Sequence, residues 1–139
     1  MAVSHYNVDK KRIFLTGLSC GAIGSWDYLS NFKASVIAAA VLLSGNPGEP
    51  TTQTSTFGKI GCSLGDAAIW SFHGDMDPTV PYAPDKDTLD SLIACPAPPR
   101  HDAQFTDVVG GGHIIWDPIY DLSGNYGDIY AWMLSNAKP

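Results

Sequence analysis

Basic residues are scarce in this chain of 139 residues, which has eight Lys and Arg against fourteen Asp and Glu. The cluster Lys10-Lys11-Arg12 is too small to give the electrostatic footprint of a protein that binds phosphate backbones or anionic membranes. No apolar run reaches the roughly eighteen residues of a membrane-spanning helix, and the first residues show no basic and apolar signal segment. The sequence therefore predicts a soluble globular protein, with neither nucleic acid nor a membrane as its partner.

Cysteine is also scarce, and three cysteines cannot all pair with one another. Cys20 lies inside the motif described below, so a disulfide, if one forms, most plausibly joins Cys62 to Cys95. Such a bond would imply an exported parent protein, secreted or periplasmic, whereas free thiols would fit a cytosolic one. The sequence leaves both alternatives open.

Neither internal repeats nor low-complexity segments are present. A chain of this length, with 45% hydrophobic and 16% charged residues, has the size and composition of one ordinary globular domain. We therefore expect residues 1–139 to form a single domain.

Four apolar, strand-like runs alternate with helical patterns, as in parallel β-α units. The near-continuous apolar run 36–43 fits a strand covered by helices on both faces, although its length also allows a helix. The expected strands are 12–16, 36–43, 67–73 and 103–109. The predicted fold class is α/β, with a mostly parallel sheet of about four strands flanked by helices.

Helices are expected between and after these strands. Pro84 suits the first turn of a helix that continues to about residue 95, and Asn125 can cap a C-terminal helix. The segment 45–65 is rich in Gly, Pro, Ser and Thr and predicts a long loop with at most a short helix. The apolar stripes that define the helices are Ile23, Trp26 and Leu29, then Leu89, Leu92 and Ile93, and finally Tyr126, Ile129, Tyr130, Met133 and Leu134.

The first chemical motif is Gly17-Leu18-Ser19-Cys20-Gly21, which follows the apolar run Ile13-Phe14-Leu15 and precedes a helical pattern. This strand-turn-helix setting is the one that a nucleophile elbow requires. Glycines on both sides of the serine would allow a turn with no room for side chains. Ser19 would then stand clear of the backbone, exposed to substrate.

A serine nucleophile needs a base, and that base needs a carboxylate to hold it in the right tautomer. Asp77 follows the third expected strand and His113 follows the fourth, so both should converge with Ser19 at the carboxyl edge of a parallel sheet. Asp75 is an alternative acid, with Asp77 then only a turn residue. His73 is expected to be a structural hydrogen-bonding residue. A metal site built from His73, Asp75, Asp77 and His113 is a further alternative, but it would leave the serine motif unexplained.

From about Tyr6 onward, the chain resembles the C-terminal half of α/β-hydrolase esterases related to polyhydroxybutyrate depolymerases and to feruloyl and acetylxylan esterases. The matching motifs are Arg12-Ile13-Phe14-Leu15-Thr16-Gly17-Leu18-Ser19-Cys20-Gly21, His73-Gly74-Asp75-Met76-Asp77-Pro78, and Gly112-His113 with Trp116 nearby. The resemblance implies that Ser19 is the nucleophile, Asp77 the acid and His113 the base. It also implies that the backbone N–H of Cys20 is one oxyanion-hole donor. Cys20 stands where such esterases often have Met, and Ala22 where they often have Gly.

The expected chemistry is hydrolysis of short-chain or soluble carboxylic esters without a cofactor or a metal. Trp116, Tyr82 and Met76 flank the catalytic loops and are expected to line the substrate pocket. Cleavage of peptide bonds by the same triad is a second possibility.

The resemblance begins at the nucleophile strand, so the family's earlier strands, and the loop that supplies its other oxyanion donor, have no counterpart in this chain. The strand from Arg12 to Thr16 should then be an exposed sheet edge, and we expect it to pair with a second copy in a homodimer. The alternative is a weak or inactive half-domain that dimerises or awaits a complementing N-terminal half.

Overall fold

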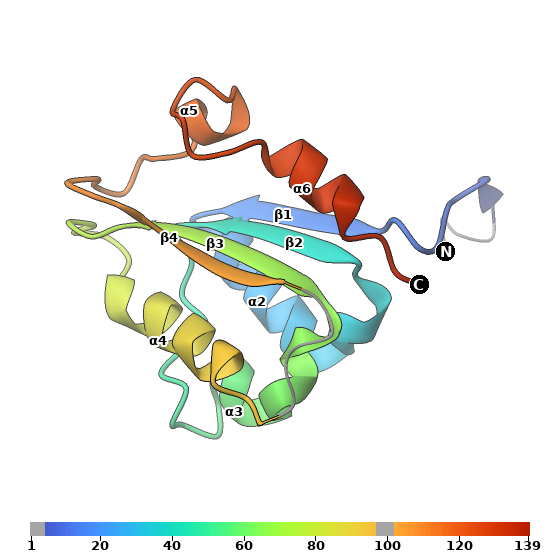
Figure 1. The fold of residues 1–139 in the computed structure, drawn as a ribbon. Coiled ribbons are helices and arrows are strands. Elements are labelled where there is room, and N and C mark those ends of the chain that lie inside the picture. Colours follow the sequence, from blue (N-terminus) through green and yellow to red (C-terminus); the bar gives the residue numbers. More distant parts are fainter. Residues whose placement is uncertain (1–4, 97–101) are drawn as a thin grey trace.

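The computed structural model describes residues 5–96 and 102–139. Its centre is a sheet of four parallel strands in the spatial order β1-β2-β3-β4 (Figure 1). The strands are β1 (Phe14–Leu18), β2 (Ala39–Leu43), β3 (Ala68–Gly74) and β4 (Ala103–Val108). The predicted α/β class and all four strands are confirmed, with shifted ends. The run 36–43 is a strand only from Ala39, because a short 3-10 turn ends at Val36.

Helices cover both faces of the sheet (Figure 1). The first face carries α2 (Cys20–Tyr28), α3 (Thr56–Ile60) and α4 (Tyr82–Ile93), and the second carries α5 (Asp117–Tyr120) and α6 (Ile129–Ser135). The described residues also form a π-helical turn (Leu29–Lys33) and two 3-10 helices (Ala34–Val36 and Gly61–Asp66). In the segment 45–65, residues 45–55 form the predicted loop, but α3 and a 3-10 helix occupy the rest, so the helical part is longer than predicted.

The two-sided cover explains the apolar composition of β2, whose five residues are all buried. Ala40 and Leu42 pack in the hydrophobic cluster that includes α2 and α4, whereas Val41 and Leu43 pack in the cluster that includes α5 and α6. Alternate residues of a strand point to opposite faces, so a strand between two cores is expected to be apolar on both faces.

The C-terminal helix begins later than predicted. Asp128, and not Asn125, caps α6, because its side chain accepts hydrogen bonds from the N–H groups of Tyr130 and Ala131. Asn125 has a φ of 54° and belongs to the turn before the helix. Asp is as good a capping residue as Asn, so the backbone of the preceding turn decides which of the two is used.

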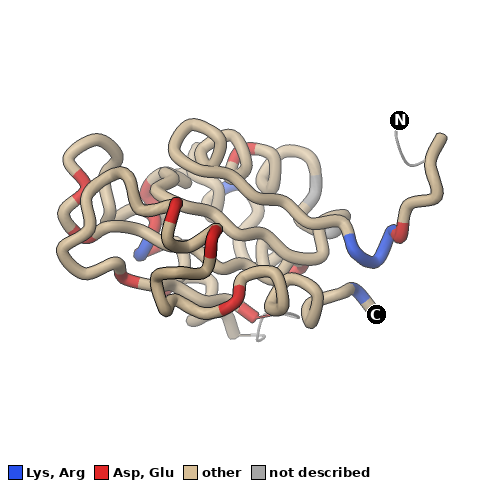
Figure 2. The backbone as a smooth tube through the Cα atoms, turned by 90° about the horizontal axis from the view of Figure 1, so that it is seen from above, with Lys and Arg blue, Asp and Glu red and all other residues tan. Residues whose placement is uncertain are grey.

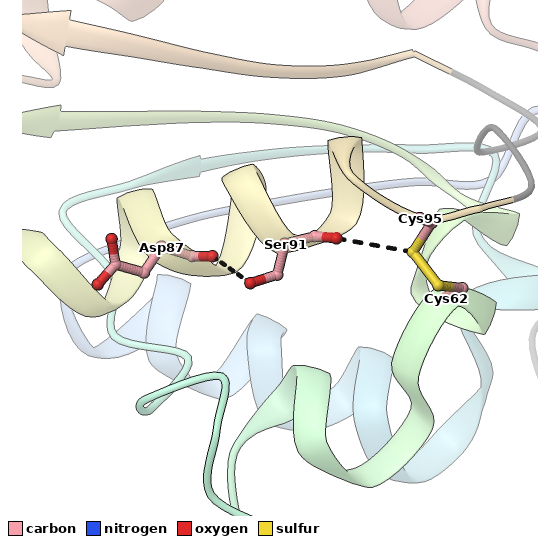
Figure 3. Close-up of a disulfide and its surroundings, with 4 residues drawn as sticks. All are labelled: Cys62, Asp87, Ser91 and Cys95. Atoms are coloured by element: carbon pink, nitrogen blue, oxygen red, sulfur yellow. Dashed lines mark hydrogen bonds between the residues drawn. A yellow bond between two sulfur atoms is a disulfide. The ribbon is translucent and has the colours of Figure 1, made fainter.

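A disulfide joins Cys62 to Cys95 across a Cα–Cα distance of 5.9 Å (Figure 3). It links the 3-10 helix that follows α3 to the end of α4, and Cys95 Sγ lies 3.7 Å from the carbonyl oxygen of Ser91. Cys20 is a free, exposed cysteine. The predicted pairing is confirmed.

Strand β1 forms one edge of the sheet and β4 the other. Within residues 5–96 and 102–139, no strand pairs with the outer side of β1. The five residues of β1 include no charge and are only partly buried, whereas β4 includes Asp107.

Basic residues lie beside both termini, and acidic residues are distributed along the rest of the backbone (Figure 2). The formal net charge is -6. In the part of the chain that the structure describes, no helix is both long and apolar enough to cross a membrane. The strands point away from the termini, so their carboxyl ends meet at the opposite edge of the sheet (Figure 1).

Candidate active site

Ser19 lies between the last residue of β1 and the first residue of α2, with φ of 51° and ψ of -121°. A non-glycine residue rarely adopts a positive φ, and such conformations concentrate at functional sites. Gly17 is required here, because a Cβ at this position would lie 2.5 Å from the carbonyl carbon of Gly21. A Cβ at Gly21 itself would meet nothing within 4 Å. The expectation that both glycines lack room is therefore wrong for Gly21.

His113 follows β4 and reaches Ser19, with its Nε2 2.9 Å from Ser19 Oγ. The backbone of His113 is held by Ser44, whose hydroxyl donates to the His113 carbonyl oxygen over 2.9 Å. Ser44 is buried, directly follows β2 and has a φ of 50°. We did not predict this residue, whose only sequence signal is a polar side chain directly after a buried strand.

Asp77 follows β3, and its Oδ2 lies 2.8 Å from His113 Nδ1. Its other oxygen, Oδ1, accepts hydrogen bonds from the N–H groups of Thr79 and Val80 over 2.8 and 3.0 Å. Burial alone would raise the pKa of Asp77, but the hydrogen bonds from His113, Val80 and Thr79 hold it below its ordinary value. A carboxylate here accepts a hydrogen bond from the Nδ1–H group, so in the neutral ring Nε2 carries the lone pair that faces Ser19.

Asp75, the alternative acid, has a different partner. Its Oδ1 accepts a hydrogen bond from the N–H of Gly110 over 2.7 Å, which ties the loop after β3 to the loop after β4. The structure thus brings Ser19, His113 and Asp77 together in one chain of hydrogen bonds and leaves Asp75 outside it.

His73 is fully buried and bonded at both ring nitrogens, as expected of a structural residue. Its Nδ1 lies 2.9 Å from Asp85 Oδ2, and its Nε2 lies 3.1 Å from the carbonyl oxygen of Val80. We did not predict a role for Asp85. The signal was its position one and two turns before Leu89 and Leu92, which places an acid on the buried face of α4. Among the described residues, no three His, Cys, Asp or Glu side chains are arranged to hold a metal ion.

The three residues predicted to line the substrate pocket lie in different surroundings. Trp116 packs edge-on against His113, with ring centres 5.6 Å apart. Met76 is 70% exposed in the turn after β3. Tyr82 packs against His73 and Phe105, and its hydroxyl donates to Asp107. Burial, together with Asp107, raises the pKa of Tyr82.

Cys20 is the first residue of α2, so its N–H has no acceptor within the helix. This N–H lies at the positive end of the helix dipole, beside the Ser19 hydroxyl, where an anion is stabilised.

A separate groove of about 380 Å³ lies over α2 and the loop that leads to α3. It contains none of Ser19, Asp77 and His113, so we assign the chemistry to the sheet edge and not to this groove. The groove is lined by Ile23, Trp26, Asp27, Asn46, Pro47, Gly48, Thr54, Thr56 and Lys59.

Solved structures with a similar fold include esterases and a peptidase. A thermostable esterase is 25% identical with a TM-score of 0.77, over 98% of this chain and 34% of its own. The acylaminoacyl peptidase of Pyrococcus horikoshii is 13% identical with a TM-score of 0.68, over 94% of this chain and 25% of its own. Esterase PE8 is 21% identical with a TM-score of 0.62, over 90% of this chain and 53% of its own.

This chain thus spans between a quarter and about half of the length of those proteins. No protein-family model and no curated protein matches the sequence. The parallel sheet and these likenesses show that the chain forms part of an α/β-hydrolase fold similar to that of esterases.

Proposed function

We propose that this chain is a serine hydrolase that cleaves carboxylic esters through an acyl-Ser19 intermediate. One observation carries the proposal, namely the successive hydrogen bonds of 2.9 and 2.8 Å from Ser19 to His113 and from His113 to Asp77. The three side chains come from loops that follow three different strands, β1, β4 and β3. Such an arrangement has no evident structural purpose, but it is the one that an activated serine requires.

In the proposed reaction, Ser19 Oγ bonds to the ester carbonyl carbon while its proton moves to His113 Nε2. The carbonyl electron pair moves to oxygen, and Asp77 stabilises the imidazolium through its bond to Nδ1. When the tetrahedral intermediate collapses, the alkoxide leaves and takes the proton from His113 as the alcohol. Water then attacks the acyl group in the same way, and the acid and the free serine are released. These reaction steps need no cofactor.

The oxyanion that forms on the carbonyl oxygen needs a donor, and the Cys20 N–H is the proposed one. It belongs to the residue after the nucleophile and points from a helix N-terminus, which suits a developing negative charge. Because this donor belongs to the backbone, the Cys20 side chain is dispensable for the role.

Short-chain or soluble esters are the proposed substrates, with Trp116, Met76 and Tyr82 as the side chains that line their pocket. The contact between Trp116 and His113 supports the first of these assignments. Amide cleavage is a second candidate, because one of the similar structures is an acylaminoacyl peptidase. Esters and anilides with the same acyl group would separate the two activities.

A fluorophosphonate probe, read by intact mass, tests the proposal without a guess about the substrate. We expect one adduct on the wild-type chain, none on Ser19→Ala and a rate at least a hundredfold lower on His113→Ala. Cys20→Ala is the matched control, because it removes the neighbouring thiol and keeps the backbone donor. A folded wild-type protein that forms no adduct would favour the alternative, a non-catalytic half-domain.

We further propose that β1 pairs with a second copy of itself across a twofold axis. This strand carries no charge, unlike β4, and uncharged edge strands tend to pair. Thr16 is the exposed residue at the middle of β1, so Thr16→Lys should shift the sedimentation equilibrium to the monomer. Gln104→Lys places the same charge on the opposite edge and should not. A wild-type chain that sediments as a monomer at high concentration would contradict the dimer.

A further inference from the structure

A second acid and base pair lies directly behind the proposed triad. The side chains of His73 and Asp85 are 0% exposed, and His73 Nδ1 lies 2.9 Å from Asp85 Oδ2. Ser71 also donates its hydroxyl to this oxygen over 2.8 Å. A buried carboxylate is costly unless it is paired and hydrogen-bonded, so the pair calls for an explanation beyond packing.

The same pair reaches the triad through Asp77. His73 Nε2 lies 3.2 Å from Asp77 Oδ2, the oxygen that also bonds His113 Nδ1 over 2.8 Å. One carboxylate oxygen therefore lies between two imidazole rings. The hydrogen-bonded series from Ser19 through His113 to Asp77 therefore meets, through the ion-pair contact between Asp77 and His73, the hydrogen-bonded pair of His73 and Asp85.

The neighbours of His73 fix its protonation. Its Nδ1 faces a carboxylate, and its Nε2 faces the carbonyl oxygen of Val80 and the carboxylate of Asp77. Burial raises the pKa of Asp85, and its hydrogen bonds with His73 and Ser71 oppose that rise. With Asp85 and Asp77 ionised, every neighbour of the ring only accepts hydrogen bonds, so both ring nitrogens donate and the ring is an imidazolium. Burial alone would lower the pKa of His73, but the hydrogen bond and charge of Asp85 hold it above its ordinary value. Tyr82, which packs edge-on at 5.8 Å, is the other titratable group that faces the ring.

We infer that His73, charged and held by Asp85, is a positioning residue that fixes the Asp77 carboxylate against His113. The expected change in kcat rests on the proposed function, whereas the protonated His73 ring beside Asp77 does not. The N–H groups of Thr79 and Val80 hold Asp77 Oδ1, and His73 Nε2 lies 3.2 Å from Oδ2, the oxygen that His113 also contacts. The carboxylate is thus fixed at both oxygens before substrate arrives, as catalytic preorganisation requires.

The positive charge of His73 has a second effect, because it lies beside the carboxylate that stabilises protonated His113. Loss of this charge would leave Asp77 more effective at stabilising the His113 imidazolium. The acidic limb of the rate profile should then move to higher pH. A residue that only fills space would not produce this shift.

The test is Asp85→Asn, which keeps the volume of the side chain and removes the charge that holds His73 protonated. We expect kcat to fall by about ten- to a hundredfold with KM within about twofold, as for a misplaced catalytic group. The acidic limb should move up by about one pH unit. Asp90→Asn is the matched control on the same helix, because Asp90 is exposed and pairs only with Lys86 among the ion pairs described.

Histidine nitrogen NMR gives a readout that does not depend on activity. In the wild-type protein, His73 should remain doubly protonated at pH 7, and the His113 titration should move upward in Asp85→Asn but not in Asp90→Asn. A neutral His73 ring in the wild-type protein would overturn the inference, even if Asp85→Asn failed to fold. An unchanged His113 titration in folded Asp85→Asn would also overturn it. A wild-type chain without hydrolase activity would refute the proposed function, and the NMR result would still decide this inference.

Discussion

The two glycines of the serine motif should respond in opposite ways to the same substitution. In Gly17→Ala, the new Cβ would lie 2.5 Å from both the carbonyl carbon and the oxygen of Gly21 and 2.8 Å from the nitrogen of Ala22. Carbon atoms in contact normally stay about 3.5 Å apart, so the end of β1 or the first turn of α2 must move by roughly 1 Å. All three obstacles are backbone atoms, which cannot rotate away.

A displacement of about 1 Å at a catalytic group can cost roughly a hundredfold in rate, and overpacking costs about 1–3 kcal/mol in stability. We therefore expect Gly17→Ala to slow fluorophosphonate labelling about a hundredfold and to lower the free energy of unfolding by that amount. Gly21→Ala should label at the wild-type rate. It should also be more stable by roughly 0.5–1 kcal/mol, because Ala favours a helix over Gly and the site has open space.

Two measurements test these effects of Gly17→Ala and Gly21→Ala: labelling rates by intact mass and unfolding curves in urea. If Gly17→Ala labelled as fast as the wild-type chain, the elbow would not need the tight turn that we describe. If Gly21→Ala were as slow as Gly17→Ala, the space beside Gly21 would be occupied in solution, for instance by another chain.

Three further results are expected. The disulfide closes a loop with a sequence separation of 33, so its removal in the double variant Cys62→Ser, Cys95→Ser should lower the free energy of unfolding by roughly 3.5 kcal/mol. Cys20→Ser should not lower it. Equal urea midpoints for the two variants would refute this prediction. The lowered pKa of Asp77 means that its contribution to stability is complete above its unfolded pKa of about 3.9 and is lost as pH falls through the folded value. The melting temperatures of wild type and Asp77→Asn should therefore differ at pH 6 and approach each other as the pH falls below the unfolded pKa, and a constant difference would contradict the assignment. Crosslinking at equal concentration should capture a wild-type dimer but not the Thr16→Lys dimer, and equal yields would count against pairing through β1.

The sequence predicted that Ser19, Asp77 and His113 would lie close together, because a local pattern marks each of these residues. Ser19 lies in a strand-turn-helix motif, and Asp77 and His113 each directly follow a strand. Parallel topology brings the carboxyl ends of strands to one edge, so three local signals became one spatial prediction. The sequence does not separate Asp77 from Asp75, since both follow β3; in the structure Asp77 contacts His113 and Asp75 contacts the N–H of Gly110.

The residues that sequence reasoning missed depend on tertiary pairing. Asp85 is acceptable on a buried helical face only because His73 lies opposite it, and no local pattern links a strand residue to a helix residue twelve positions later. Ser44 similarly acquires its role from the backbone of His113, which is distant in sequence. The cap of α6 was misplaced for a smaller reason, because Asn125 and Asp128 are both capping residues and only the turn geometry distinguishes them.

The hydrogen bonds at the carboxyl edge explain how loops can hold catalytic geometry. The N–H of Ser19 donates to the carbonyl oxygen of Leu43, and the N–H of Ser44 donates to that of Phe72, so the sheet ladder extends past the strand ends. Ser44 then fixes the His113 backbone. Every loop that carries a triad residue is therefore anchored to a neighbouring strand or loop. Because the disulfide lies at the end of α4 and outside this hydrogen-bonded network, its reduction should lower the unfolding midpoint while the labelling rate of the folded protein stays unchanged.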